Sequence, residues 1–196
     1  QFDFWVGEWY VVPNPDTTPA TAQPSREPAR SVIQKTQGGC VILETWDDRQ
    51  GGTGQSFNIY DRVTQEWHQT WVSNNGSLHQ YWGELKDGKM VFTGEVPLPP
   101  SARVQGRRTV RLSFIPLGPD KVRQFSESLN SDGTWSVNYD LIYTRRAKTR
   151  NLRDRPECSL LVLDLENPRR YLEVRGRARI EPDPDYVFAS PILTAH

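Results

Sequence analysis

The stretch WHQTWV at residues 67–72 decides the fold class, because large apolar and polar side chains alternate along it. Successive side chains of a β-strand point to opposite faces of the sheet. Trp67, Gln69 and Trp71 therefore share one face, on which an amide lies between two indoles. A strand of this kind, with one aromatic face, indicates a sheet that encloses a core or a cavity.

Similar short segments, rich in Trp, Tyr, Val, Ile and Phe, recur on both sides of this stretch and are separated by Gly, Asn, Asp or Pro. Asn75-Gly76 and Asp87-Gly88 are strong hairpin turns, because these residue types tolerate positive φ. Closely spaced short strands are typical of an antiparallel sandwich or barrel. We expect an all-β fold with strands at residues 5–12, 31–36, 40–46, 55–60, 66–72, 78–85, 89–95, 107–115, 121–128 and 135–143.

Two regions depart from this pattern. Residues 13–30 contain five prolines and no periodicity, which predicts a long loop. After residue 143 the basic run 144–155 precedes Pro156 and predicts a short helix that ends there, followed by strands at 159–164 and 170–181. We therefore divide the chain into a barrel at residues 1–146 and a small appendage, one helix and two strands, at residues 147–196.

Charge and composition exclude several classes of partner. Lys and Arg number 24, Asp and Glu number 24, and the net charge is +0, so the long-range field that nucleic-acid binding needs is missing. No window approaches 18 apolar residues, so we expect no membrane partner. Cys40 and Cys158 are far apart and indicate two reduced thiols and a cytoplasmic protein. The chain starts at Gln1 without a leader, so we expect that a processed segment precedes it or that it has been trimmed.

The inward face of the predicted barrel supplies candidate ligand-binding residues. On the strand at 40–46, Glu44 and Trp46 share a face by alternation. Polar groups among aromatic walls orient small, partly apolar ligands. The alternative is that the indoles fill a solid core in which the polar groups bond one another. The candidates are Glu44, Trp46, Ser56, Asn58, Trp67, Gln69, Trp71 and Gln124.

Five segments of the barrel region, in this order along the chain, resemble an uncharacterised bacterial family of lipocalin-like, calycin-type β-barrels. They are FDFWVGEW at 2–9, CVILETW at 40–46, GQSFNIYD at 54–61, WHQTWV at 67–72 and SLNSDGTW at 128–135. The resemblance implies an up-and-down barrel with a central cavity, and Trp9 as a structural residue across its base. It implies no activity.

Haem, metal and hydrolytic sites have little support in the sequence. His68, His79 and His196 are the only histidines, and His68 alternates away from the proposed interior. No paired Cys and His spacing indicates a metal, and no Gly-x-Ser-x-Gly motif accompanies the histidines. No cofactor is therefore expected in the barrel.

The appendage resembles a different family. KTRNLRDRPECSLLV at 148–162 and YLEVRGRA at 171–178 are similar to the split-barrel flavin and deazaflavin enzymes related to pyridoxamine-phosphate oxidase. The resemblance implies that Lys148 and Asn151, with Arg150 and Arg175 as companions, hold the phosphate of FMN or a deazaflavin. The alternative is a solvated basic helix, since only about fifty residues match and half of a cofactor site would be missing.

An isolated helix with two strands buries too little apolar surface to be stable alone. We expect it to pack on the barrel or to pair with a second chain, giving a homodimer. The leading hypothesis for function is a non-enzymatic barrel that binds a small apolar or amphipathic molecule. The alternatives are a flavin- or deazaflavin-dependent oxidoreductase and a folded fusion without a ligand.

Overall fold

The computed structural model describes residues 2–17, 27–98, 106–145, 155–163 and 171–178. The chain forms two compact units, Gln1–Arg145 and Arg146–His196. Regular structure in the described residues is β-sheet, apart from one turn of 3-10 helix at Asp3–Trp5. This confirms the predicted all-β class.

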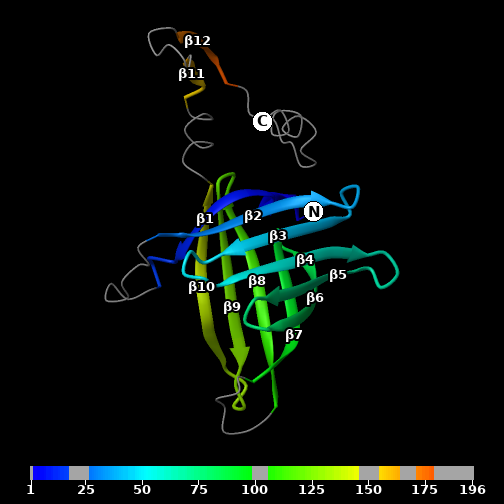
Figure 1. Cartoon of the computed structure of the whole chain (residues 1–196). Helices are drawn as coiled ribbons and strands as arrows, with labels where there is room; N and C mark the ends of the chain where they lie inside the picture. The colour runs from blue at the N-terminus through cyan, green and yellow to red at the C-terminus, as the bar shows by residue number, and fades with distance from the viewer. Residues whose placement is uncertain (1, 18–26, 99–105, 146–154, 164–170, 179–196) are drawn as a thin grey trace. The chain divides into compact units, whose positions relative to one another are not determined.

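The first unit is a closed antiparallel barrel of ten strands, in which each strand pairs with its neighbours in sequence and β1 closes the barrel against β10 (Figure 1). This up-and-down topology follows from hairpin connections between consecutive strands. All ten predicted strands are present. Their bounds are β1 Gly7–Pro13, β2 Ala29–Thr36, β3 Val41–Asp47, β4 Thr53–Asp61, β5 Glu66–Ser73, β6 Leu78–Lys86, β7 Lys89–Pro97, β8 Arg107–Gly118, β9 Lys121–Leu129 and β10 Trp135–Arg145.

Several strand boundaries differ from the predictions by one to three residues, and two of the differences have a clear cause. β1 begins at Gly7 rather than at residue 5, because Trp5 ends the 3-10 turn. The predicted helix at 144–155 is wrong at its start, since Thr144 and Arg145 continue β10 and pair with Tyr10 and Trp9. The Arg145 guanidinium lies 4.4 Å from the centre of the Trp9 ring, which favours the extended backbone there. The rest of that helix, at 146–154, lies outside the described residues.

The N-terminal residues close one end of the barrel. Phe2 and Trp5 are fully buried and stack with their ring centres 5.1 Å apart, and the Trp5 ring lies 4.4 Å from Phe114. Phe92 and Phe114 complete this aromatic cluster from β7 and β8. Because strand direction alternates, the turns β2–β3, β4–β5, β6–β7 and β8–β9 lie at this closed end.

The opposite end of the barrel carries the connections β1–β2, β3–β4, β5–β6, β7–β8 and β9–β10. Gly54 at the start of β4 and Trp71 near the end of β5 face inward at this end. No aromatic plug comparable to Phe2 and Trp5 fills it among the described residues. The two ends of the barrel therefore differ, and the interior is solid only toward the closed end.

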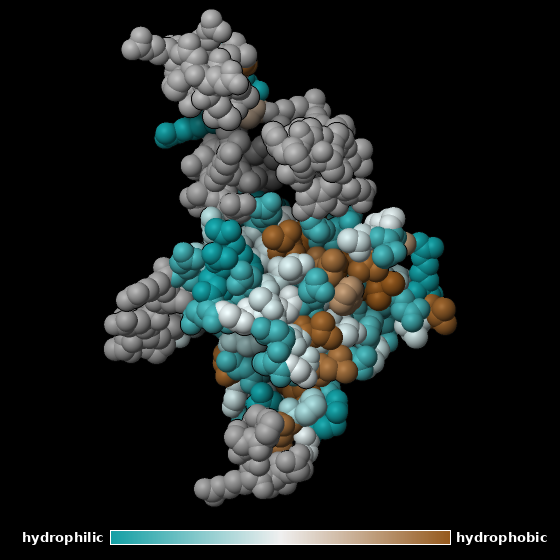
Figure 2. Space-filling model, in the orientation of Figure 1, coloured by the Kyte–Doolittle hydropathy of each residue, from teal (hydrophilic) through white to brown (hydrophobic). Residues whose placement is uncertain are grey.

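The outer face of the barrel carries an apolar patch over β4–β6 (Figure 2). Phe57, Ile59, Leu78 and Trp82 are 38% to 56% exposed. His68 also points outward, and its ring lies 5.0 Å from Trp82, which agrees with the outward position predicted for it.

The second unit contains two antiparallel strands, β11 at Glu157–Leu163 and β12 at Tyr171–Arg177. Both strands were predicted, and the second ends four residues earlier than expected. Cys158 and, in the barrel, Cys40 are exposed and carry free thiols. No helix among the described residues is long and apolar enough to cross a membrane.

Candidate functional site: a cavity in the barrel

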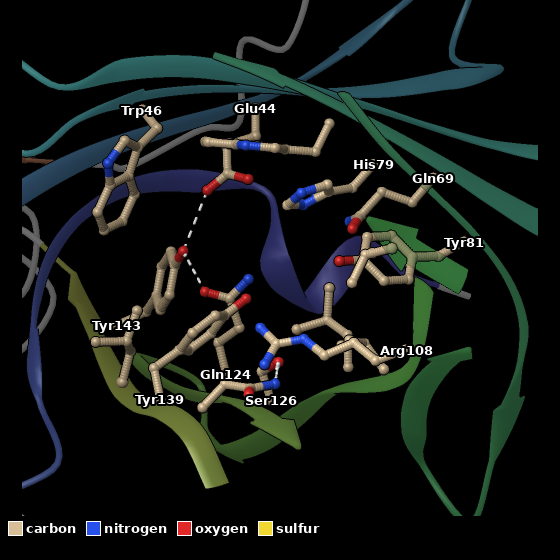
Figure 3. Close-up of a pocket in the computed structure, with 16 residues that line it drawn as sticks. Glu44, Trp46, Gln69, His79, Tyr81, Arg108, Gln124, Ser126, Tyr139 and Tyr143 are labelled. Carbon is tan, nitrogen blue, oxygen red and sulfur yellow. Dashed lines mark hydrogen bonds between the residues drawn. The ribbon is translucent and has the colours of Figure 1, made fainter. Parts of the chain in front are cut away.

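A cavity of about 460 Å³ occupies the barrel beyond the aromatic plug (Figure 3). It is lined from β3, β5 and β6 on one side and from β7 to β10 on the other. Its volume lies within the range of about 300–1,000 Å³ that is typical of small-molecule sites.

Aromatic side chains form much of the cavity wall. Trp46 faces it from β3 and Tyr81 from β6 (Figure 3). Trp71 lines it from β5. Both indoles are only partly buried, so part of each ring surface faces the cavity rather than packed protein. Gly54 leaves room for the Trp71 indole, because a Cβ at residue 54 would lie only 2.4 Å from the ring.

The remaining walls are aliphatic on the side of β7 and β8. Val96, Val110 and Leu112 face inward there and are at most 3% exposed, and Leu141 faces inward from β10. β-branched and leucine side chains of this kind offer an apolar surface without hydrogen-bonding groups. Aliphatic surface is therefore concentrated on β7 and β8, opposite the indoles of β3 and β5.

A β-bulge shapes the rim of the cavity. The register between β9 and β10 shifts between Val137 and Tyr139, so that the neighbours Asn138 and Tyr139 both line the cavity. In a regular strand they would point to opposite faces. The Asn138 amide donates to Ser126 Oγ at 3.1 Å and accepts from Ser128 Oγ at 2.8 Å, which fixes its orientation.

A hydrogen-bonded network of buried polar side chains crosses the barrel between the plug and the cavity. Gln69 Nε2 donates to Asn58 Oδ1 at 2.7 Å, and Asn58 Nδ2 donates to Ser56 Oγ at 3.1 Å. Ser56 Oγ in turn donates to Glu44 Oε2 at 3.0 Å. Because every link pairs a donor with an acceptor, these buried groups are stable in an otherwise apolar interior.

The network continues from Glu44 to the other side of the barrel. Tyr143 Oη lies 3.1 Å from Glu44 Oε1 and 2.9 Å from Gln124 Oε1 (Figure 3). With the Gln124 oxygen oriented in this way, the single Tyr143 hydrogen serves only one of the two oxygens. A proton on Glu44 completes the second bond. Burial raises the pKa of the Glu44 carboxyl, despite hydrogen bonds from Ser31 and Ser56, so the neutral form is favoured.

One arginine, Arg108, lines the cavity in the described part of the chain. Its Nε is buried and has no hydrogen-bond partner. Burial, together with the nearby Arg108 charge, lowers the pKa of His79. Burial raises the pKa of Tyr81 to about 12, with Arg108 opposing that rise. Near neutral pH the cavity thus contains a guanidinium ion, a neutral phenol and a neutral imidazole.

The structure brings most of the predicted barrel residues together. Glu44, Trp46, Gln69, Trp71 and Gln124 line the cavity. The other three predicted residues do not line it. Ser56 and Asn58 lie behind the wall as members of the polar network. Trp67 belongs to the closed end, where its ring centre is 5.8 Å from that of Phe2.

The residues predicted to hold a flavin phosphate belong to the second unit. Lys148, Arg150 and Asn151 lie outside the described residues. Arg175 lies on β12, is exposed, and its Nε is 2.9 Å from Glu173 Oε1. The Arg175 guanidinium is therefore already paired with a carboxylate.

Several cavity residues were missed by the sequence analysis. Arg108 is the most informative, because alternation along β8 places it on the inward face with Val110, Leu112 and Phe114. A lone arginine on an otherwise apolar face was a signal that could have been found. Tyr81 and Tyr143 follow from the same alternation on β6 and β10, although it could not show which end of each strand meets the cavity.

Comparisons with known proteins add no further identification. No family model matches the sequence, and no curated protein matches it significantly. Among the described residues no three His, Cys, Asp or Glu side chains gather where they could bind a metal ion. The candidate site therefore stands on its geometry.

Proposed function

We propose that this protein is a lipocalin-like barrel that binds one small apolar or amphipathic molecule in the cavity of its first unit. The observation that carries the proposal is the cavity of about 460 Å³ beside the partly uncovered faces of Trp46 and Trp71. Exposed aromatic surface is costly in water, and covering it with a ligand is favourable by roughly 25 cal/mol per Å² of apolar area.

The distribution of polar groups supports a binding role for the cavity. Apart from Arg108, the wall contributed by β7 and β8 is aliphatic. The buried network supplies hydrogen-bond partners to Glu44, Gln69 and Gln124. A ligand thus meets apolar surface with a few polar groups at defined places, which is how small-molecule sites are built. The resemblance of residues 1–146 to lipocalin-like barrels implies a central cavity of this kind, although it implies no activity.

Titration with decanol, an uncharged amphiphile, tests this proposal while tryptophan fluorescence is followed. We expect saturable binding of one decanol per chain. Replacing Trp71 with Ala removes one aromatic wall, and we expect it to weaken binding by about tenfold, equivalent to about 1.4 kcal/mol.

Trp82→Ala is the matched control, because it removes an indole from the outer face of β6. We expect this variant to bind decanol as the wild type does. Thermal unfolding of both variants establishes that they are folded. Equal losses in the two variants, or non-saturable binding to the wild type, would contradict the proposal.

Native mass spectrometry of the freshly purified full chain tests the proposal without a chosen probe. A bound molecule adds its own mass to that of the chain, and solvent extraction then separates it for identification. We expect an apolar or amphipathic compound that Trp71→Ala retains less well than Trp82→Ala. Recovery of FMN or a deazaflavin would instead favour the oxidoreductase alternative.

A further inference from the structure

Arg108 places a positive charge in the cavity wall, and no carboxylate of the described residues is paired with it. On the outer face of β8 and β9 the pattern is different. Arg111 bonds Glu127 at 2.8 Å, and Arg123 bonds Asp140 at 2.8 Å. The Arg108 side chain is only partly buried, but its Nε is fully buried and has no partner. A charged group with a buried, unpaired donor is unfavourable, so such groups usually have a function.

We propose that the ligand of the cavity carries a single carboxylate that binds the Arg108 guanidinium, while its apolar part covers Trp46 and Trp71. This inference rests on the proposed function and specifies the chemical class of the ligand. A guanidinium presents parallel N–H donors that match the two oxygens of a carboxylate. The buried, unpartnered Nε is one of those donors.

The charges around Arg108 favour a monoanion. Glu44 also lines the cavity, but its buried carboxyl is already hydrogen-bonded to Ser31, Ser56 and Tyr143. Tyr81 and His79 also line the cavity, and burial favours the neutral form of each. One carboxylate therefore neutralises the cavity, whereas a phosphate dianion would leave a negative charge without a partner in an apolar enclosure.

The surroundings of Arg108 also define where the two ends of the ligand lie. The Tyr81 hydroxyl points into the cavity beside Arg108 and can donate to an anionic oxygen (Figure 3). Trp46 lies across the cavity from the guanidinium in the same view. Leu112 and Leu141 provide further apolar wall. A molecule with an acid at one end and a hydrocarbon body matches this division.

The test compares four probes with the same alkyl chain: decanoate, decanol, decylamine and decyl phosphate. Binding to the wild-type full chain is measured by calorimetry at neutral pH and below the concentrations at which the probes form micelles. We expect decanoate to bind at least tenfold more tightly than decanol and more tightly than decyl phosphate. Decylamine is expected to bind most weakly, because its ammonium meets a like charge.

Arg108→Met keeps an unbranched side chain as far as the position of Nε and removes the charge, so we expect it to abolish the preference for decanoate over decanol while decanol still binds. Arg107→Met is the matched control, because Arg107 is the exposed neighbour on β8 and bonds the Glu95 carbonyl outside the cavity. It changes the net charge equally and is expected to keep the preference. Arg108→Lys is expected to retain part of it, since an ammonium lacks the forked donors.

The outcomes separate the two proposals. If none of the probes binds, the proposed function fails and the inference fails with it. If decanol binds as tightly as decanoate to the wild type, or Arg108→Met keeps the preference, binding in the cavity stands and the carboxylate assignment is overturned. Tighter binding of decyl phosphate than of decanoate also overturns it. The ranking of probes on the wild-type protein is decisive even if a variant fails to fold.

Discussion

Tyr143 Oη lies 3.1 Å from Glu44 Oε1, although the two residues are 99 positions apart in the sequence. This contact joins β3 to β10 across the interior of the barrel. Both side chains are buried, and burial raises the pKa of each group. Their hydrogen bond therefore links opposite sides of the cavity floor, and burial favours the neutral form of both groups.

Glu44→Gln is predicted to stabilise the protein above about pH 5. The pKa of Glu44 is raised in the folded state, so above the unfolded value of about 4.5 the unfolded chain releases a proton that the folded chain keeps. Stability then falls as pH rises toward the folded pKa. Glutamine is neutral at every pH and removes this dependence. Urea unfolding at several pH values measures the effect, and a variant with the wild-type pH dependence would contradict it.

Glu44→Leu is the contrasting substitution at the same position. Leucine leaves the buried Ser31 and Ser56 hydroxyls without their shared acceptor. We expect a loss of about 1–3 kcal/mol in the free energy of unfolding, since unsatisfied buried polar groups are unfavourable by about that much. A Leu variant as stable as the Gln variant would show that the network contributes little.

Phe114→Ala is predicted to destabilise the barrel by about 3–5 kcal/mol. Phe114 is fully buried and lies against Phe2 and Trp5, so its removal leaves a cavity in the plug. Leu117→Ala, at a position 49% exposed near the end of the same strand, is the control and should change stability by less than about 0.5 kcal/mol. Denaturant unfolding distinguishes the two, and similar losses would contradict the aromatic plug.

Gly54→Ala is predicted to move the Trp71 indole and to weaken decanol binding. The added Cβ would lie 2.4 Å from the ring and 2.8 Å from the Val72 carbonyl oxygen, so one of them must shift. Overpacking of this kind is unfavourable by about 1–3 kcal/mol. At Gly106 the nearest atom is 3.5 Å from such a Cβ, and Gly106→Ala is expected to be neutral in both measurements. Unchanged binding in Gly54→Ala would argue against Trp71 as a wall of the site.

The full chain is predicted to form a homodimer at micromolar concentration. The second unit contains a sheet of only two strands in the described residues, so each strand has a free edge. The barrel also exposes Phe57 and Trp82 on its outer face. Sedimentation equilibrium measures the mass, and a monomer at every concentration would contradict this prediction.

The strands were predictable from the sequence because their signals are local. Alternation along residues 67–72 and turns such as Asn75-Gly76 determine strand faces and hairpin positions without reference to distant residues. The same local signals failed at Thr144 and Arg145, where pairing with β1 and the contact of Arg145 with Trp9 outweigh helix propensity.

The division between core and cavity was not predictable in the same way. Trp67 and Trp71 share one face of β5, yet Trp67 lies against Phe2 and Trp71 lines the cavity. Alternation identifies the face, whereas the height along the barrel axis depends on where the N-terminal residues insert. The partial exposure of the Trp71 side chain thus follows from long-range packing, which a short sequence motif does not reveal.

A crystal structure of the full chain grown with decanoate tests the central claim most directly. We predict one decanoate inside the barrel, with its carboxylate about 2.7–2.9 Å from the Arg108 guanidinium and its alkyl chain against Trp46 and Trp71. A barrel interior filled by side chains, or decanoate bound only on the outer face near Trp82, would contradict the account.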